Sequence, residues 1–314
     1  MHPAGSVILF TTSSGAGYGL LALLGVLGPT SLVPHSQWFG LVALGLALAL
    51  ITGGLIASTF HLGHPERAWR AVTQWRSSWL SREGVMALVT YVPAVIFAVG
   101  WVLLGATSGA WVLAGMLAAI GAALTVTCTG MIYASLKPIR QWRDPLVVPL
   151  YLGFALASGA LCLNALQHLF GASSRTLVAL ALAATAGAWF AKLVYWRRID
   201  REASDSTPES ATGLGALGAV RPLDPPHSEE NYLLREMGFR VARKHAAKLR
   251  LIALAAGAVL PLLLTVIQFG AYGATAALFA VLAALFAGLG LAVERWLFFA
   301  EARHAVTLYY GRRP

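Results

Sequence analysis

Eight apolar runs, each about 20 residues long, divide this chain and limit what it can fold into. A helix of that length crosses the hydrocarbon core of a bilayer. Lipid offers no partners to free backbone groups, so such runs cross it as helices. The sequence therefore predicts an all-α integral membrane bundle of eight transmembrane helices. We place them at residues 7–27, 38–60, 84–105, 110–136, 146–169, 176–196, 251–270 and 274–297.

The composition supports this interpretation. The chain is 58% hydrophobic and only 11% charged, which excludes a disordered protein and argues against an ordinary soluble domain. No flexible linker separates two folded units, so residues 1–314 are expected to form a single membrane domain. One long polar insert interrupts it at about 197–248. The second part of the insert, 229–248, predicts a helix that either lies on the membrane surface or contacts a partner.

Basic residues are distributed very unevenly between the two faces of such a bundle. If eight spans alternate in direction, both termini share a face with the connections after spans two, four and six. That face carries every one of the 23 Lys and Arg residues except Arg175, and the 13 acidic residues lie there or in span ends near it. By the positive-inside rule this face is cytoplasmic, which predicts a multi-pass protein of the bacterial inner membrane with both termini inside.

The net charge of +10 does not indicate nucleic acid, because the charge is confined to this one face. The charged face is instead where a large soluble partner is expected to dock. Arg70, Arg76, Arg140 and Arg143 are the candidate docking residues. The alternative is that these arginines serve only membrane topology and contact anionic lipid.

The segment from His61 to Trp69, together with Glu83, is the most unusual part of the charged face. Ionisable groups this close to hydrocarbon are costly and usually functional. His61 ends the second span, where an imidazole can donate to a quinone oxygen or take a proton from a quinol. Its alternative role is to satisfy a carbonyl at the helix end. Glu83 lies where the third span begins. Its carboxylate is either a proton acceptor or simply a helix cap.

Two further residues are candidates for a quinone site. Arg67 lies three residues before Arg70, on the same helical face, and either orients a quinone or contacts lipid phosphate or a partner's acid. Tyr133 closes the fourth span on the same side, and contributes a phenol to the site or is an ordinary interfacial tyrosine. Glu294 and Arg295 near the end of the last span suggest an ion pair with another span, or a proton path.

The sequence offers no support for haem or metal in this chain. Cys128 and Cys162 fall inside apolar spans without metal-ligand spacing. No two histidines face each other at mid-membrane from different spans, as axial haem ligands would. A quinone, either ubiquinone or menaquinone, is therefore the expected redox partner, and no catalytic centre is expected in the chain itself.

The eight spans, the motif His61-Leu-Gly-x-Pro-x-Arg-Ala68 and the motif Leu80-Ser-x-Glu83 resemble the membrane anchor subunits of the DMSO reductase family (DmsC type). The resemblance implies a non-catalytic subunit that holds a molybdopterin catalytic subunit and an iron–sulfur subunit on the membrane. It also implies a quinone site near the iron–sulfur subunit, involving His61 and Glu83. With the charged face cytoplasmic, the chain is most similar to the branch that serves cytoplasm-facing sulfite dehydrogenase complexes. Sulfite oxidation would then supply electrons to quinone.

Three alternatives stay open at this stage. A DMSO reductase-like complex would run electrons from quinol to substrate, and a purely structural anchor would bind no quinone. A small-solute transporter, from a different class, predicts charge at mid-membrane and broken helices. The near absence of such charge in the spans counts against a transporter.

Overall fold

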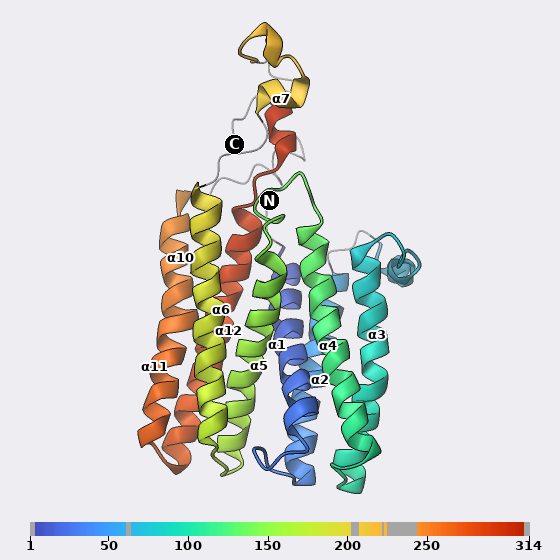
Figure 1. The fold of residues 1–314 in the computed structure, drawn as a ribbon, viewed down its shortest axis with the longest axis vertical. Helices are drawn as coiled ribbons and strands as arrows, with labels where there is room; N and C mark the ends of the chain where they lie inside the picture. The colour runs from blue at the N-terminus through green and yellow to red at the C-terminus, as the bar shows by residue number, and fades with distance from the viewer. Residues whose placement is uncertain (1–3, 61–63, 202–206, 222, 225–243, 311–314) are drawn as a thin grey trace.

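A computed structural model describes residues 4–60, 64–201, 207–221, 223–224 and 244–310 of the chain. The part it describes is entirely helical (Figure 1) and contains eight helices long and apolar enough to cross a membrane, which confirms the predicted architecture. Seven are α1 (Gly5–Leu27), α2 (Gln37–Thr59), α3 (Trp79–Ala98) with η2 (Val99–Leu103), α4 (Ala110–Ala134), α5 (Val147–Leu169), α6 (Arg175–Arg201) and α12 (Gly273–Ala300). The remaining span joins α10 (Ala246–Leu254), η4 (Ala255–Val259), α11 (Leu260–Ile267) and η5 (Gln268–Gly270).

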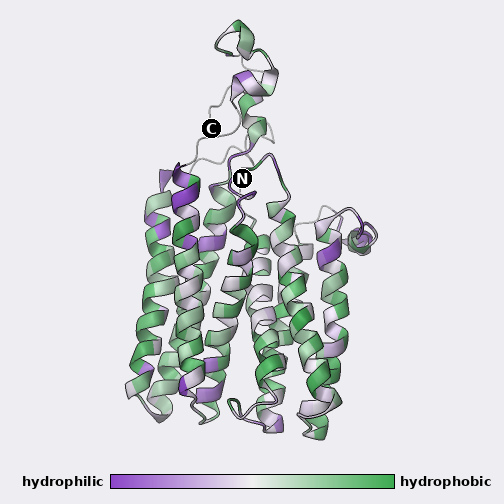
Figure 2. Ribbon diagram, in the orientation of Figure 1, coloured by the Kyte–Doolittle hydropathy of each residue, from purple (hydrophilic) through white to green (hydrophobic). Residues whose placement is uncertain are grey.

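The two ends of the bundle differ sharply. One end, called the charged end below, is where α1 begins and α12 ends (Figure 1). It also carries four short helices: η1 (Pro65–Val72), α7 (Pro208–Thr212), η3 (Gly215–Leu217) and η6 (Ala305–Tyr310). The opposite, far end has only short connections, and Arg175 is the one Lys or Arg that the structure describes there. Figure 2, a ribbon coloured by residue hydropathy, shows hydrophobic residues along most of each span and strongly hydrophilic ones at the charged end.

Helices α1 and α5 form the centre of the bundle. α1 packs against α2, α4 and α5, while α5 packs against α6 and α12. The α1–α5 contact is backbone against backbone: a Cβ added at Gly19 would overlap the carbonyl group of Ala155, and one at Gly159 would overlap Gly19. Helices surrounded by lipid gain little from hiding apolar surface from each other, so close approach through small residues supplies the van der Waals contact that holds them together.

Several spans, α3 and α6 among them, extend further than their apolar runs. α3 begins at Trp79, with Ser78 as the N-cap that accepts from the Ser81 backbone N–H at 3.5 Å. α6 continues to Arg201, five residues past the expected end. Hydropathy reports only the apolar part of a helix, whereas the backbone hydrogen-bond ladder continues into the polar zone. Most of the helix predicted at 229–248 lies outside the described residues, and the chain is already in α10 at Ala246.

We expect Gly19→Ala to weaken the bundle, because the added methyl group must push α1 away from α5. Overpacking of this kind costs on the order of 1–3 kcal/mol. Gly53→Ala is the matched control, since an added Cβ at Gly53 meets nothing within 4 Å. The midpoint of thermal unfolding in detergent should fall for Gly19→Ala and stay unchanged for Gly53→Ala. Equal midpoints for the two variants would contradict the close α1–α5 contact.

Candidate functional site

Glu83 is buried in the second turn of α3, with 4% of its surface exposed. It lies on the face that also buries Ala87, Thr90 and Ala94, at helical spacing. Since the helix starts at Trp79 and Ser78 caps it, Glu83 is not an N-cap. Its Cα lies about 6 Å along the helix axis from that of Trp79.

The partner of Glu83 comes from α4. The hydroxyl of Thr129 donates a hydrogen bond to Oε1 of Glu83, and both residues are buried. Further into the bundle, Thr90 of α3 and Thr125 of α4 bring their hydroxyls within 3.3 Å of each other. A polar seam therefore runs between α3 and α4, from Glu83 toward the middle of the membrane.

An apolar groove opens beside this seam on the outer surface of the same two helices. Its volume is about 620 Å³. It begins at Met86, one turn beyond Glu83, and continues toward the far end as far as Ala110. Leu117, Ile120 and Val92 line it and are 48%, 58% and 62% exposed, so the groove faces lipid. The arrangement places a buried carboxylate close to one end of a long, apolar, lipid-facing channel.

A second set of buried charges lies between α6 and α12. Nζ of Lys192 is 2.5 Å from Oε1 of Glu294, and Nη1 of Arg295 is 3.5 Å from Oε2 of the same carboxylate. None of the three is more than 2% exposed. The Arg295 guanidinium also lies 3.9 Å from the ring centroid of Tyr151. This set, called the ion cluster below, is the interspan ion pair that Glu294 and Arg295 suggested in the sequence.

Lys192 lies near the end of the predicted span 176–196, and α6 continues nine residues beyond it. Its side chain is nevertheless covered by the bundle, with 1% exposed. The ion cluster and the Glu83 site are also neighbours. One small cavity is lined by Thr129, which binds Glu83, and by Arg295 of the ion cluster, and Ser14 and Tyr151 line it as well.

The other predicted quinone-site residues differ in what the structure shows of them. His61 lies outside the described residues. Arg67 is on η1, with 55% of its side chain exposed, and its Nε lies 3.7 Å from Oε1 of Glu66. Tyr133 lies one turn past Thr129 on α4, inside an aromatic cluster with Trp142, Tyr151, Phe298 and Phe299.

The predicted docking arginines differ in accessibility. Arg70 and Arg76 are exposed, and their guanidinium groups lie 5.5 Å and 5.4 Å from the ring centroids of Trp69 and Trp75. Arg143 is exposed as well, whereas Arg140 is half-buried. Three of the four are therefore available on the surface of the charged end.

Sequence reasoning missed Thr129. A four-residue spacing places Thr125, Thr129 and Tyr133 on one face of α4. Nothing in the sequence indicates that α3 covers that face. Among the described residues, no three His, Cys, Asp or Glu side chains are grouped as a metal site would need.

Comparisons with known proteins agree on one family. The family model described as the DMSO reductase anchor subunit (DmsC) matches residues 1–199. Over 327 aligned residues the chain is 34% identical to a sulfite dehydrogenase subunit of Allochromatium vinosum. That alignment covers 99% of each chain.

Substitutions in the ion cluster test whether its charges stabilise one another. Glu294→Gln leaves Lys192 and Arg295 buried without their carboxylate, which should cost about 3–5 kcal/mol. Lys192→Met should cost less, because Arg295 still faces Glu294. The double variant should be more stable than the sum of the two losses predicts.

Thermal unfolding in detergent measures all three variants. Glu66→Gln is the control: its pair with Arg67 is exposed, and such pairs contribute at most about 1 kcal/mol. Strictly additive losses in the double variant would show that Lys192 and Glu294 do not interact.

Proposed function

The chain belongs to the DMSO reductase anchor subunit family, and from that premise we propose that it binds a quinone between α3 and α4 and exchanges protons with it through Glu83. As an anchor it is a subunit of a multi-subunit reductase or dehydrogenase complex in the membrane. The redox centres that oxidise or reduce the substrate are then expected in partner subunits.

The observation that carries this proposal is the pairing of Glu83 with the apolar groove. A quinone joins a polar ring to a long apolar tail, and its binding site must accept both. Glu83 and Thr129 supply polar groups at one end, and the groove beyond Met86 supplies an apolar channel about 620 Å³ in volume. A membrane protein retains an intramembrane carboxylate only at a cost, so a functional role is the default explanation.

Reduction of a bound quinone consumes two electrons and two protons. A carboxyl group placed beside the ring oxygen can donate one of those protons as a general acid. Thr129 holds the Glu83 carboxylate through its hydroxyl, and so sets the direction in which the carboxyl group points. Exclusion of bulk water at this depth strengthens such hydrogen bonds.

His61, Arg67 and Tyr133 complete the proposed site in different ways. His61 follows α2 by two residues in the sequence, and we assign it the second ring oxygen. Arg67, exposed on η1, fits the edge of the site rather than its centre. Tyr133 fits the wall next to the aromatic cluster, one turn from Thr129.

The electron donor is proposed to dock at the charged end. Exposed Arg70, Arg76 and Arg143 suit an iron–sulfur subunit with an acidic surface, which in turn would carry a molybdopterin catalytic subunit. The basic residues at this end favour a cytoplasmic orientation. The relative's name supports sulfite as the source of electrons, with ubiquinone or menaquinone as acceptor. The family model's description keeps the reverse direction, from quinol to a DMSO-like substrate, as the second candidate.

Replacing Glu83 tests the proposed proton donor. Glu83→Gln keeps the shape but removes the acid, and quinone-linked turnover of the whole complex should fall about 100-fold. His61→Ala should abolish quinone reduction. Thr129→Val should lower it by roughly tenfold through loss of one hydrogen bond to a charged group.

The soluble subunits should keep their activity with an artificial dye in each of these variants. Thr127→Val is the matched control for Thr129→Val, because the Thr127 hydroxyl bonds to the Ala123 carbonyl of its own helix. A Glu83→Gln complex that reduces quinone at the normal rate would refute the role given to Glu83.

Filling the groove tests where the quinone tail lies. Leu117→Trp should raise the KM for a long-tailed quinone about tenfold, since contact with roughly two methylene groups is lost. A quinone analogue with a short tail should be unaffected. Leu285→Trp serves as the control, because Leu285 is equally lipid-facing, at 60% exposed, but lies on α12. The groove assignment fails if the two tryptophan variants behave alike with the long-tailed quinone.

A further inference from the structure

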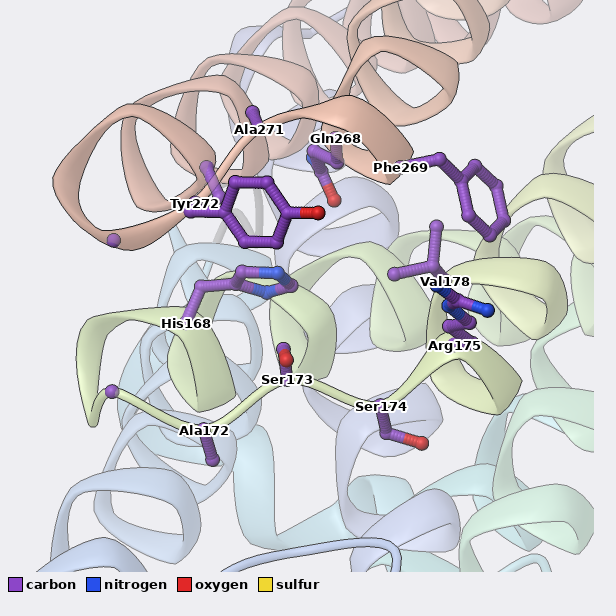
Figure 3. A pocket seen from close by; sticks show the side chains of 13 residues that line it. His168, Ala172, Ser173, Ser174, Arg175, Val178, Gln268, Phe269, Ala271 and Tyr272 are labelled. Carbon is purple, nitrogen blue, oxygen red and sulfur yellow. The ribbon is translucent and has the colours of Figure 1, made fainter.

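A polar pocket lies at the far end of the bundle, opposite the proposed quinone site. It sits between the α5–α6 connection and the start of α12, with a cavity volume of about 140 Å³ (Figure 3). His168 and Tyr272 face each other across it, and Ser173, Arg175 and Gln268 also line it. The quinone proposal does not involve this end.

The pocket is electropositive and has no acidic neighbour in the connections at its end of the bundle. Arg175 is the one Lys or Arg described at the far end. The connections there, residues 28–36, 104–109, 170–174 and 271–272, contain no Asp or Glu. The charge of Arg175 therefore has no carboxylate beside it in these connections.

Two long helices begin at the pocket and add to this potential. α6 starts at Arg175, and α12 starts at Gly273; both residues line the cavity. The N-terminus of a helix carries partial positive charge and backbone N–H groups without intrahelical partners. Ser174 caps α6 by accepting from the Leu177 N–H at 3.4 Å, but Tyr272 gives α12 no side-chain cap. The first N–H groups of α12 are thus left for another acceptor.

A buried side chain independently indicates a ligand. Gln268 lines the pocket and is only 5% exposed. Its Oε1 accepts from Nδ2 of Asn164 at 2.7 Å, yet its Nε2 has no hydrogen-bond partner among the described residues. Leaving such a donor unsatisfied costs about 1–3 kcal/mol. Its Nε2 therefore needs an acceptor, and a ligand in the pocket would supply one.

His168 is oriented in a way that suits the same kind of ligand. Its Nδ1–H donates to the backbone carbonyl of Asn164 at 2.8 Å, since a carbonyl can only accept. That bond leaves the other ring nitrogen, Nε2, for a ligand. The polar groups of this pocket are thus mainly donors, which is the chemistry of an oxyanion site.

The volume of the cavity and the exposed aromatic residues at its rim indicate which anion fits. Pockets for whole drug-sized ligands or cofactors measure about 300–1,000 Å³, so this cavity suits a small group. Phe269 and Tyr272 at its rim are 45% and 83% exposed, as side chains at a membrane edge are. A phospholipid headgroup offers a phosphate at this depth and acyl chains for the apolar rim.

We propose that the pocket formed by His168, Arg175 and Gln268 binds a phosphate group, supplied by a phospholipid headgroup of the leaflet at the far end. The bound phosphate joins the α5–α6 connection to the start of α12, since both segments line the pocket. This proposal does not depend on the quinone site.

The test compares Arg175→Gln with Arg201→Gln in the purified full complex. The two arginines occupy opposite ends of α6, so the second variant is a matched control. After detergent washing, native mass spectrometry and phosphorus analysis measure the phospholipid that remains bound. Wild type and Arg201→Gln should retain a phospholipid, and Arg175→Gln should bind it about tenfold more weakly.

A second arm adds inorganic phosphate alone to delipidated protein and follows the unfolding midpoint. A rise that depends on Arg175, with no retained lipid, supports the phosphate site and assigns it to the free ion. Ser173→Ala provides a milder variant if Arg175→Gln fails to fold, and it should weaken retention in the same direction. Equal phospholipid retention in all variants, together with no effect of phosphate, would overturn the proposal.

Discussion

Hydrocarbon cannot hydrogen-bond to a protein, and the rest of this structure follows from that constraint. Every backbone group inside the membrane must find a partner in the chain, which makes the eight spans helical. The same constraint acts on side chains. The cost of burying Glu83 is offset because Thr129 donates a hydrogen bond to its carboxylate. The carboxylate of Glu294 is compensated by the charges of Lys192 and Arg295. Each buried charge thereby specifies which helices must meet.

Both sets of buried charge lie toward the charged end, on either side of the central α1–α5 pair. Glu83 and Thr129 join α3 to α4, whereas Lys192 and Glu294 join α6 to α12. Glycine contacts let α1 and α5 approach closely between them. The result is a layer of buried polar groups within a bundle whose spans are mostly apolar. We propose that the Glu83 side of this layer takes part in quinone chemistry, while the ion cluster on the other side holds α6 and α12 together.

The sequence predicted some features well and others only in outline. Glu83 was identified from its place at the start of a span, and the ion pair of Glu294 was anticipated without its partner. The burial of Lys192 carried no signal in the sequence, because hydropathy does not report which side chains the neighbouring helices cover. Thr129 carried no signal of its own, since a threonine in a span usually bonds to its own helix. His61 lies outside the described residues, and its role stays a prediction.

The number of spans, the all-helical fold and the concentration of charge at one end were determined by the sequence alone. They depend on local composition and on alternation along the chain, which need no knowledge of contacts. Only the tertiary structure decided which faces meet: Glu83 against Thr129, Lys192 against Glu294, and the pocket where α6 and α12 both begin. These contacts join residues tens to more than a hundred positions apart. Spans that are apolar on every side show no preferred face in the sequence, so the choice of partners is made by packing.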